Sequence, residues 1–273
     1  MPRAVALLDV RSSAAPYARM IGAGFRRYSS YRQATVAGLF TNVVFGLLRV
    51  SVLFAMLDGR REIAGYDPAR SATYVWLGQG MLATVVLWGQ HEIGERVRTG
   101  DVVVDLSRPW NLQLALLAED LGRAGYAVLT RFLPPVVFGA LFFPFLWPQH
   151  SLTWLLFPLS LALAVGVSFC ARFLLALSAF WLLDNRGPVS LYGMSAGILG
   201  GLIVPLAFFP DWVQTVLWLT PFPCLVQAPI DVFTEAGSPL IPLAYQAIWF
   251  GILYLGGRLA MRGAVHKVVV QGG

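Results

Sequence analysis

Charged residues, and lysine above all, are scarce in this chain of 273 residues. Lys, Arg, Asp and Glu make up 12% of it, whereas 57% of the residues are hydrophobic and the mean hydropathy is +0.67. A soluble domain carries about twice that share of charge, so this chain has too little polar surface for a water-soluble globule. Its apolar residues run in long stretches and do not alternate, which favours membrane-spanning helices over a transmembrane β-barrel.

The single lysine, Lys267, excludes one kind of catalysis. A phosphate-binding loop of the form Gly-x-x-x-x-Gly-Lys-Ser/Thr needs a lysine before a hydroxyl residue, and Lys267 is followed by Val268. We therefore expect that this chain alone hydrolyses no ATP, contributes no catalytic residue and binds no cofactor.

Metal ligands are few as well. The three histidines, His91, His150 and His266, lie far apart, and Cys170 and Cys224 have no metal-binding spacing. The run that begins at His91 starts like a zinc-protease motif but lacks the second histidine. We predict no metal site.

Six apolar stretches are long enough to cross a bilayer, which takes about 20 residues of α-helix. The fold class is therefore an all-α polytopic membrane protein with six transmembrane helices. The fourth stretch is longer than one crossing, and the Pro134-Pro135 pair should kink the third. The predicted spans are Ala37–Leu57, Ala72–Gln90, Gly125–Trp147, Leu152–Leu183, Val189–Phe209 and Leu240–Met261.

Basic residues predict the orientation of these spans. Fourteen of them fall before the first span, in the second and fourth connections and in the tail, against three in the other connections. The excess places both termini in the cytoplasm. The same excess of basic residues gives the pI of about 9.7, and in a membrane protein such residues face anionic lipid. No soluble basic domain is present to bind nucleic acid, so we predict no nucleic-acid partner.

Two further segments suit the membrane surface. Apolar residues recur at helical spacing between Pro16 and Gln33, with arginines on other faces, which predicts an amphipathic helix in the cytoplasmic interface. The segment 210–239 is rich in Pro, Trp and Phe and predicts an extracytoplasmic hairpin of short helices. The resulting organisation is an N-terminus (1–36), a transmembrane domain (37–262) with a cytoplasmic loop at about 94–122, and a cytoplasmic tail (263–273).

Three arginines lie within apolar stretches, where charge is costly in lipid. Arg131 and Arg172 are close enough to the cytoplasmic side to extend towards water, whereas Arg49 lies deepest, with Asn42 two turns earlier. Arg49 and Asn42 are therefore candidates for a substrate path, although Arg49 could equally extend outward beside Asp58.

The segment after the second span carries a resemblance to a known family. Residues 99–109 read Thr-Gly-Asp-Val-Val-Val-Asp-Leu-Ser-Arg-Pro, which resembles the cytoplasmic loop of ABC-2 class permeases, in particular bacterial six-span exporters. Three further features are similar to that family and extend the resemblance over nearly the whole chain. These are the N-terminal interfacial helix, the runs 209–212 and 220–222, and the tail 270–273.

The resemblance implies the membrane subunit of an ATP-binding-cassette exporter in the bacterial inner (plasma) membrane. Its partners would be a cytoplasmic ATPase subunit, which binds ATP and Mg, a second permease subunit, identical or a sister chain, and membrane lipid. The substrate would be hydrophobic or amphipathic and would move outward. The family likeness makes 100–109 the segment that couples to the ATPase, with an ordinary interfacial loop as the alternative. The coupling residues would be Gly100, Asp101, Asp105, Leu106, Arg108 and Pro109, with Val102 to Val104 as apolar contacts.

Two other functions compete with this interpretation. An ion-coupled secondary transporter would have acidic residues inside its spans and two related halves, and no Asp or Glu lies near the middle of a predicted span. An intramembrane enzyme would use Glu92 and Glu95 as an acid/base pair, but residues at such a position more often pair with nearby arginines such as Arg96 or Arg98.

Overall fold

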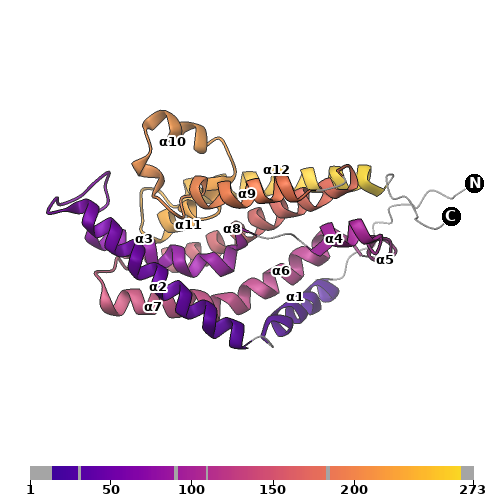
Figure 1. Cartoon of the computed structure of the whole chain (residues 1–273), viewed down its shortest axis with the longest axis horizontal. Helices are drawn as coiled ribbons and strands as arrows, with labels where there is room; N and C mark the ends of the chain where they lie inside the picture. The colour runs from indigo at the N-terminus through magenta and orange to yellow at the C-terminus, as the bar shows by residue number, and fades with distance from the viewer. Residues whose placement is uncertain (1–13, 30–31, 89–91, 109, 183–184, 266–273) are drawn as a thin grey trace, which may run out of the picture.

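The computed structural model describes residues 14–29, 32–88, 92–108, 110–182 and 185–265, and every regular element within these ranges is helical. The helices form an elongated bundle (Figure 1). Four helical stretches in the described ranges are long and apolar enough to cross a membrane. The prediction of an all-helical membrane protein is therefore confirmed, and the prediction of six spans is confirmed for four of them.

The four long stretches correspond to the first, third, fourth and sixth predicted spans. The first lies in α2 (Arg32–Leu57), and the fourth comprises α8 (Thr153–Leu177) with a 3-10 turn at Ser178–Phe180. The sixth lies in α12 (Leu240–Val265). The third is a continuous stretch of 31 residues, Leu112–Phe142, made of α6 (Leu112–Ala127), a π-helical segment and α7 (Leu133–Phe142).

The third stretch corrects one predicted boundary. Residues 112–122 were expected in a cytoplasmic loop, but they form the start of α6 and continue into the span. Asn111 explains where the helix begins, because its side-chain oxygen accepts from the Leu114 backbone N–H as an N-cap. The π-helical segment Val128–Phe132 directly precedes Pro134 and Pro135, which agrees with a distortion caused by prolines that cannot donate to the helix ladder.

The second and fifth predicted spans differ most from expectation. In place of the second lies α3 (Pro68–Met81), which continues as a π-helical segment to Val86. In place of the fifth lies α9 (Arg186–Leu199), a helix of 14 residues. The predicted span continues to Phe209, but α9 ends earlier, at Gly200 and Gly201.

A Schellman motif ends α9. Gly201 takes a φ of +78°, its N–H bonds to the Ile198 carbonyl, and the Leu202 N–H bonds to the Gly197 carbonyl. Glycine adopts this left-handed conformation without the steric cost that a Cβ would add. The chain then continues through a short 3-10 turn (Leu206–Phe208) into α10 (Asp211–Leu217) and, after a second 3-10 turn (Phe222–Cys224), α11 (Gln227–Phe233).

Helix α3 is the centre of the larger core, and every residue from Ser71 to Met81 is buried. Trp76 fits between two glycines of neighbouring helices. A Cβ on Gly139 would lie 2.1 Å from the Trp76 ring, and a Cβ on Gly46 would lie 2.5 Å from it. These glycines let α2 and α7 approach α3 closely, and we call this arrangement the α3 core.

The predicted N-terminal amphipathic helix is present as α1 (Ala14–Ser29), and it packs on α6. Its approach depends on glycines on both sides. A Cβ on Gly24 would lie 2.2 Å from the Glu119 carbonyl oxygen, and a Cβ on Gly122 would lie 2.0 Å from the Ile21 carbonyl oxygen. The location of α1 at the membrane surface stays a prediction.

The ends of the bundle separate two groups of segments (Figure 1). Helices α1, α4 (Glu92–Thr99) and α5 (Val102–Leu106) lie towards the same end as the last turns of α12. The connection between α2 and α3 and helix α10 lie towards the opposite end. The grouping matches the one derived from basic residues, and the orientation of the bundle in a membrane stays a prediction.

Candidate functional site

The segment that resembles a coupling loop forms two short helices joined by a sharp turn. Gly100 sits between α4 and α5 with a φ of +83°. The Thr99 hydroxyl donates to the Asp101 carboxylate at 2.7 Å, and the Ser107 hydroxyl donates to the Val104 carbonyl at 2.8 Å. The segment is therefore a structured helical hairpin.

One ion pair closes this hairpin. Arg96 Nη1 of α4 donates to both carboxylate oxygens of Asp105 in α5, at 2.8 and 2.9 Å. The Asp105 side chain is buried, so its carboxylate stabilises the hairpin itself and does not face outward. Charge-assisted bonds of this kind are shorter and stronger than neutral ones.

The outer surface of α5 combines apolar and charged side chains. Val103 and Val104 are exposed, at 42% and 59% of their surface, whereas Val102 is buried. Arg108 is exposed and lies over the Trp110 ring at 5.5 Å. Pro109, the last residue of the predicted coupling segment, lies outside the described residues.

The apolar underside of the hairpin contacts a transmembrane helix. Val102 belongs to a buried cluster with Phe169, Phe173 and Leu177 of α8, and Leu106 packs against the same cluster. Helix α4 also packs on α8, so the hairpin and α8 share one apolar cluster, and close-packed clusters of this kind deform little.

Arg49 and Asn42, the candidates for a substrate path, both donate to backbone carbonyls of neighbouring segments. The Arg49 guanidinium donates to the Leu202 carbonyl and, at 3.5 Å, to the Ile203 carbonyl. Asn42 Nδ2 donates to the Gln79 carbonyl of α3 at 3.3 Å. Arg49 therefore satisfies carbonyls at the break after α9, where the helix ladder no longer does so.

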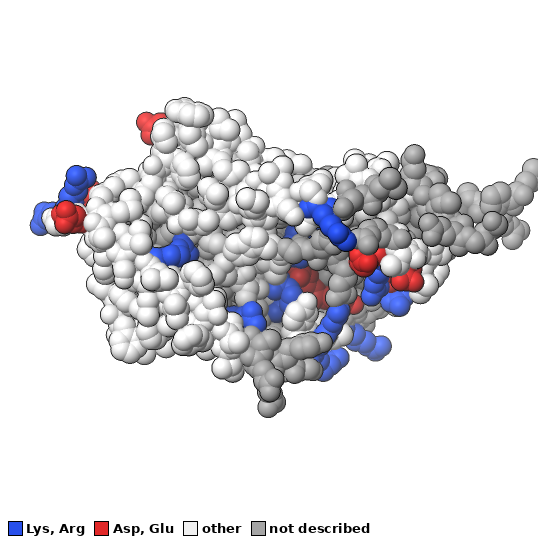
Figure 2. Space-filling view, in the orientation of Figure 1, with Lys and Arg blue, Asp and Glu red and all other residues white. Residues whose placement is uncertain are grey.

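A large cavity of about 570 Å³ opens at the end of the bundle that holds α1, α4 and α5. We call it the charged cavity, because six arginines and three carboxylates of the described part of the chain line it, with a formal charge of +3. Figure 2 shows blue and red side chains gathered in and around this hollow, whereas most of the remaining face is white. The arginines are Arg27, Arg96, Arg108, Arg123, Arg131 and Arg172, and the acids are Asp105, Glu119 and Asp120.

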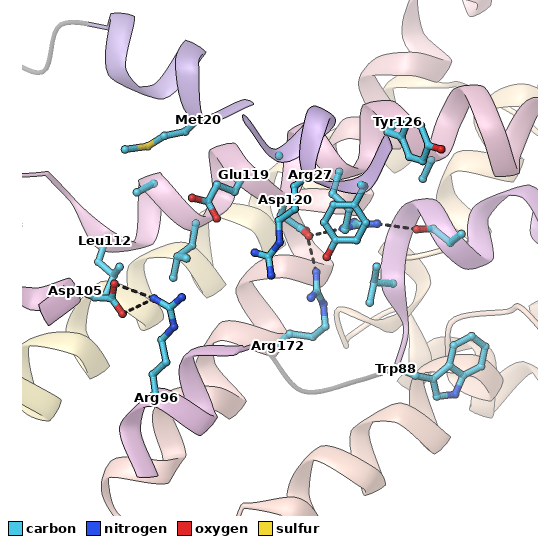
Figure 3. Close-up of a pocket in the computed structure, with 18 of the residues that line it drawn as sticks. Met20, Arg27, Trp88, Arg96, Asp105, Leu112, Glu119, Asp120, Tyr126 and Arg172 are labelled. Carbon is cyan, nitrogen blue, oxygen red and sulfur yellow. Dashed lines mark hydrogen bonds and ion pairs between the residues drawn. The ribbon is translucent and has the colours of Figure 1, made fainter. Parts of the chain in front are cut away.

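Asp120 lies at the centre of the charged cavity, between two arginines (Figure 3). Its Oδ1 accepts from Arg123 Nε at 2.7 Å, and its Oδ2 accepts from Arg172 Nη2 of α8 at 2.9 Å. All three side chains are less than a tenth exposed. Arg123 also donates to the carbonyls of Ala83 and Thr84 in the π-helical end of α3, at 2.7 and 2.9 Å. One charged cluster therefore connects α3, α6 and α8.

This cluster is not among the sites predicted from the sequence. The predicted cytoplasmic loop 94–122 contains Asp120, and Arg172 was predicted to extend towards water and not to pair with an acid in the protein. The spacing of Asp120 and Arg123, three apart on a helix that is otherwise apolar, was the available signal.

The remaining predictions concern acids and metals. Glu95 is exposed, and the side chain of Glu92 lies outside the described residues, so the acid/base pair stays a prediction. Among the described residues no group of three or more His, Cys, Asp or Glu could hold a metal ion.

A second, smaller cavity of about 160 Å³ lies near α10 and α11. Asp231 lines it, accepts from Gln227 Nε2 at 2.8 Å, and has Tyr66 and Arg70 as neighbours in the cavity wall. Burial raises the pKa of Asp231 to about 6, against the opposing effects of the Gln227 bond and the Arg70 charge.

Comparison with known proteins identifies the family. A search of curated proteins found no match. A family model described as ABC-2 family transporter protein matches residues 40–272, which extends from the first long helix to the tail and includes both the hairpin and the charged cavity's α6 and α8 residues. The resemblance seen in residues 99–109 is therefore confirmed at the level of the family, and the chain belongs to the ABC-2 family of transporter proteins.

Proposed function

We propose that this chain is the membrane permease subunit of an ATP-driven exporter. The family match supports a role in transport, and the family is generally a non-catalytic membrane component that associates with an ATP-binding-cassette ATPase. In this proposal a separate cytoplasmic subunit binds ATP and Mg, a second permease completes the pathway, and an amphipathic or hydrophobic substrate moves outward across a bacterial inner membrane.

The α4–α5 hairpin is the proposed contact with the ATPase. Its outer surface offers Val103 and Val104 for an apolar groove and Arg108 for an acidic partner, at the end of the bundle that the basic residues predict to be cytoplasmic. The Arg96–Asp105 pair holds the two helices together, so that force on one moves both.

The observation that carries this proposal is the contact between the hairpin and α8. Val102 and Leu106 on the underside of α5 pack against the cluster of Phe169 and Phe173. A push on the outer surface of α5 therefore reaches a membrane-spanning helix without passing through a flexible linker. A loop with no buried side chain would bend under the same force without displacing the membrane-spanning helix.

Charge reversal at Arg108 tests the proposal. Arg108→Glu should weaken co-purification of the ATPase or uncouple ATP hydrolysis from export, because losing one partner of a desolvated ion pair costs about 2–5 kcal/mol. Membrane insertion should be unchanged. The matched control is Arg61→Glu, which reverses an exposed arginine at the opposite end of the bundle and should have little effect.

A direct contact can be measured with a cysteine at Ser107, which is exposed beside Arg108. Ser107→Cys should crosslink to the ATPase, and the permease purified without that subunit should hydrolyse no ATP. If Ser107→Cys never crosslinks and Arg108→Glu exports normally, coupling runs through another element.

A further inference from the structure

Among the described residues that line the charged cavity, positive charge exceeds negative charge. Six arginines face three acids around one space, and one of those acids, Asp105, already pairs with Arg96 at the hairpin. The cavity keeps a formal charge of +3 beside the apolar bundle. Positive charge in a low-dielectric wall attracts anions strongly, since water screens it less there than at an open surface.

In the buried part of the cavity, positive charge also exceeds negative charge. Asp120 shares its single negative charge between Arg123 and Arg172, which are both buried. A buried guanidinium that lacks full compensation is costly in a protein interior. An anion held in the cavity would complete this balance, and the planar guanidinium group matches the oxygens of phosphate.

The remaining wall of the cavity is apolar. Met20 of α1, Leu116 of α6, Val86 and Trp88 line the same space as the arginines. Figure 3 shows Met20 and Trp88 on either side of the Asp120–Arg172 pair. The volume of about 570 Å³ lies within the range of about 300–1,000 Å³ that holds small molecules. A wall of this composition fits a headgroup together with the first carbons of an apolar tail.

We propose that the charged cavity binds the phosphate group of an amphiphile and that this is the substrate class of the transporter. The inference rests on the proposed function and deepens it. Phosphate oxygens are held by Arg27 and Arg172 beside Asp120, since Arg123 already donates to Asp120 and to two backbone carbonyls. The tail leaves along the apolar wall. The site is built from α1, α6 and α8, and from the π-helical end of α3, so substrate occupancy changes the charge balance at the junction of these helices.

Dodecyl phosphate, titrated into the purified full-length chain in phosphatidylcholine nanodiscs, is the test. Calorimetry against nanodiscs without protein gives the Kd. Arg27→Gln should raise this Kd about tenfold, which is the effect of removing one hydrogen-bonded charge. Arg26→Gln is the matched control. It removes an exposed arginine one position earlier on α1 that does not line the cavity, and it should change the Kd less than twofold.

Protection of a cysteine gives a second measurement that leaves all the arginines in place. Met20→Cys should react with a maleimide, and dodecyl phosphate should slow that reaction about tenfold at saturation, whereas dodecyltrimethylammonium should not slow it. Inorganic phosphate distinguishes the source of the ligand. Weaker protection by inorganic phosphate identifies an amphiphile, and equal protection identifies a free anion site and overturns the assignment to a lipid-like substrate.

The proposal requires both the expected Kd and the expected protection of the cysteine. If dodecyl phosphate does not protect Met20→Cys, or if Arg27→Gln binds it within twofold of the unchanged chain, the cavity is no phosphate site. Co-purification of the ATPase with the Arg27→Gln variant separates this failure from failure of the proposed function. If the variant still co-purifies with the ATPase but binds no dodecyl phosphate, the defect concerns the cavity alone. If the unchanged chain co-purifies with no ATPase, the proposed function is contradicted.

Discussion

The α3 core and the charged cavity are held together by different interactions. In the α3 core, Trp76 contacts the backbone at Gly46 and Gly139 directly, and a methyl group at either position has no room. In the charged cavity, Asp120 joins α6 to α8, and Arg123 joins α6 to α3, through buried contacts in the wall of an open space of about 570 Å³. The α3 core is held by close packing and leaves no space, whereas the helices around the charged cavity leave a space and are connected by ion pairs.

This difference indicates what each region can do. Close-packed side chains have few alternative arrangements, so helices α2, α3 and α7 should move as one unit. Ion pairs around a cavity can exchange partners when an anion enters, because the exchange replaces one charged contact by another. We expect the charged cavity to respond to ligand and the α3 core to transmit that response.

The largest effect should follow the loss of the Asp120 carboxylate. Asp120→Ala leaves Arg123 and Arg172 buried without their shared partner, and breaking a buried ion pair in this way costs about 3–5 kcal/mol. Thermal unfolding in detergent should show a large decrease in Tm. Glu62→Ala removes an exposed carboxylate at the opposite end and should change the Tm little. Equal Tm values for the two variants would show that charge does not hold the cavity together.

A methyl group in the α3 core should have the next largest effect. Gly139→Ala places a Cβ 2.1 Å from Trp76 Cγ, and inserting atoms into a packed core costs about 1–3 kcal/mol. Gly251→Ala on α12 is the matched control, since no atom lies within 4 Å of its Cβ and alanine favours helix. A Gly139→Ala variant as stable as Gly251→Ala would contradict close packing around Trp76.

Arg49 tests whether the α3 core also depends on a charged contact. Arg49→Met removes the donors to the Leu202 and Ile203 carbonyls, and leaving such a carbonyl unpaired costs about 1–3 kcal/mol. Arg49→Lys keeps a cation that can still donate, so its Tm should lie between those of Arg49→Met and the unchanged chain. If Arg49→Met alters substrate-stimulated ATPase without lowering the Tm, Arg49 belongs to a substrate path instead.

The smallest effect should be a pH dependence from Asp231, at the end opposite the charged cavity. Its folded-state pKa of about 6 is higher than the usual value of 3.8, so the folded state binds the proton more tightly. Its contribution to stability should therefore fall as pH rises from about 4 to 6 and stay constant above that range. The difference in Tm between the unchanged chain and Asp231→Asn, measured from pH 4 to 8, isolates this group. A difference independent of pH would contradict the raised pKa.

The sequence by itself determined the class of the protein and much of its helical content. Long apolar stretches predicted the spans in α2, α8 and α12, because transfer into lipid depends on the average composition of a segment. The spacing of apolar residues predicted α1, and the single lysine excluded a phosphate-binding loop. Residues 99–109 indicated the family that the match over residues 40–272 confirms.

Only the tertiary structure decided which charged residues meet. Asp120 and Arg172 are 52 positions apart, and their contact depends on how α6 packs on α8. The same holds for Asp105, which the sequence offered to a partner protein and the fold pairs with Arg96. Helix α3 is polar for a span, yet it is buried because protein surrounds it. Composition describes each segment in its average surroundings, whereas partners and burial depend on the neighbouring helices that folding places beside it.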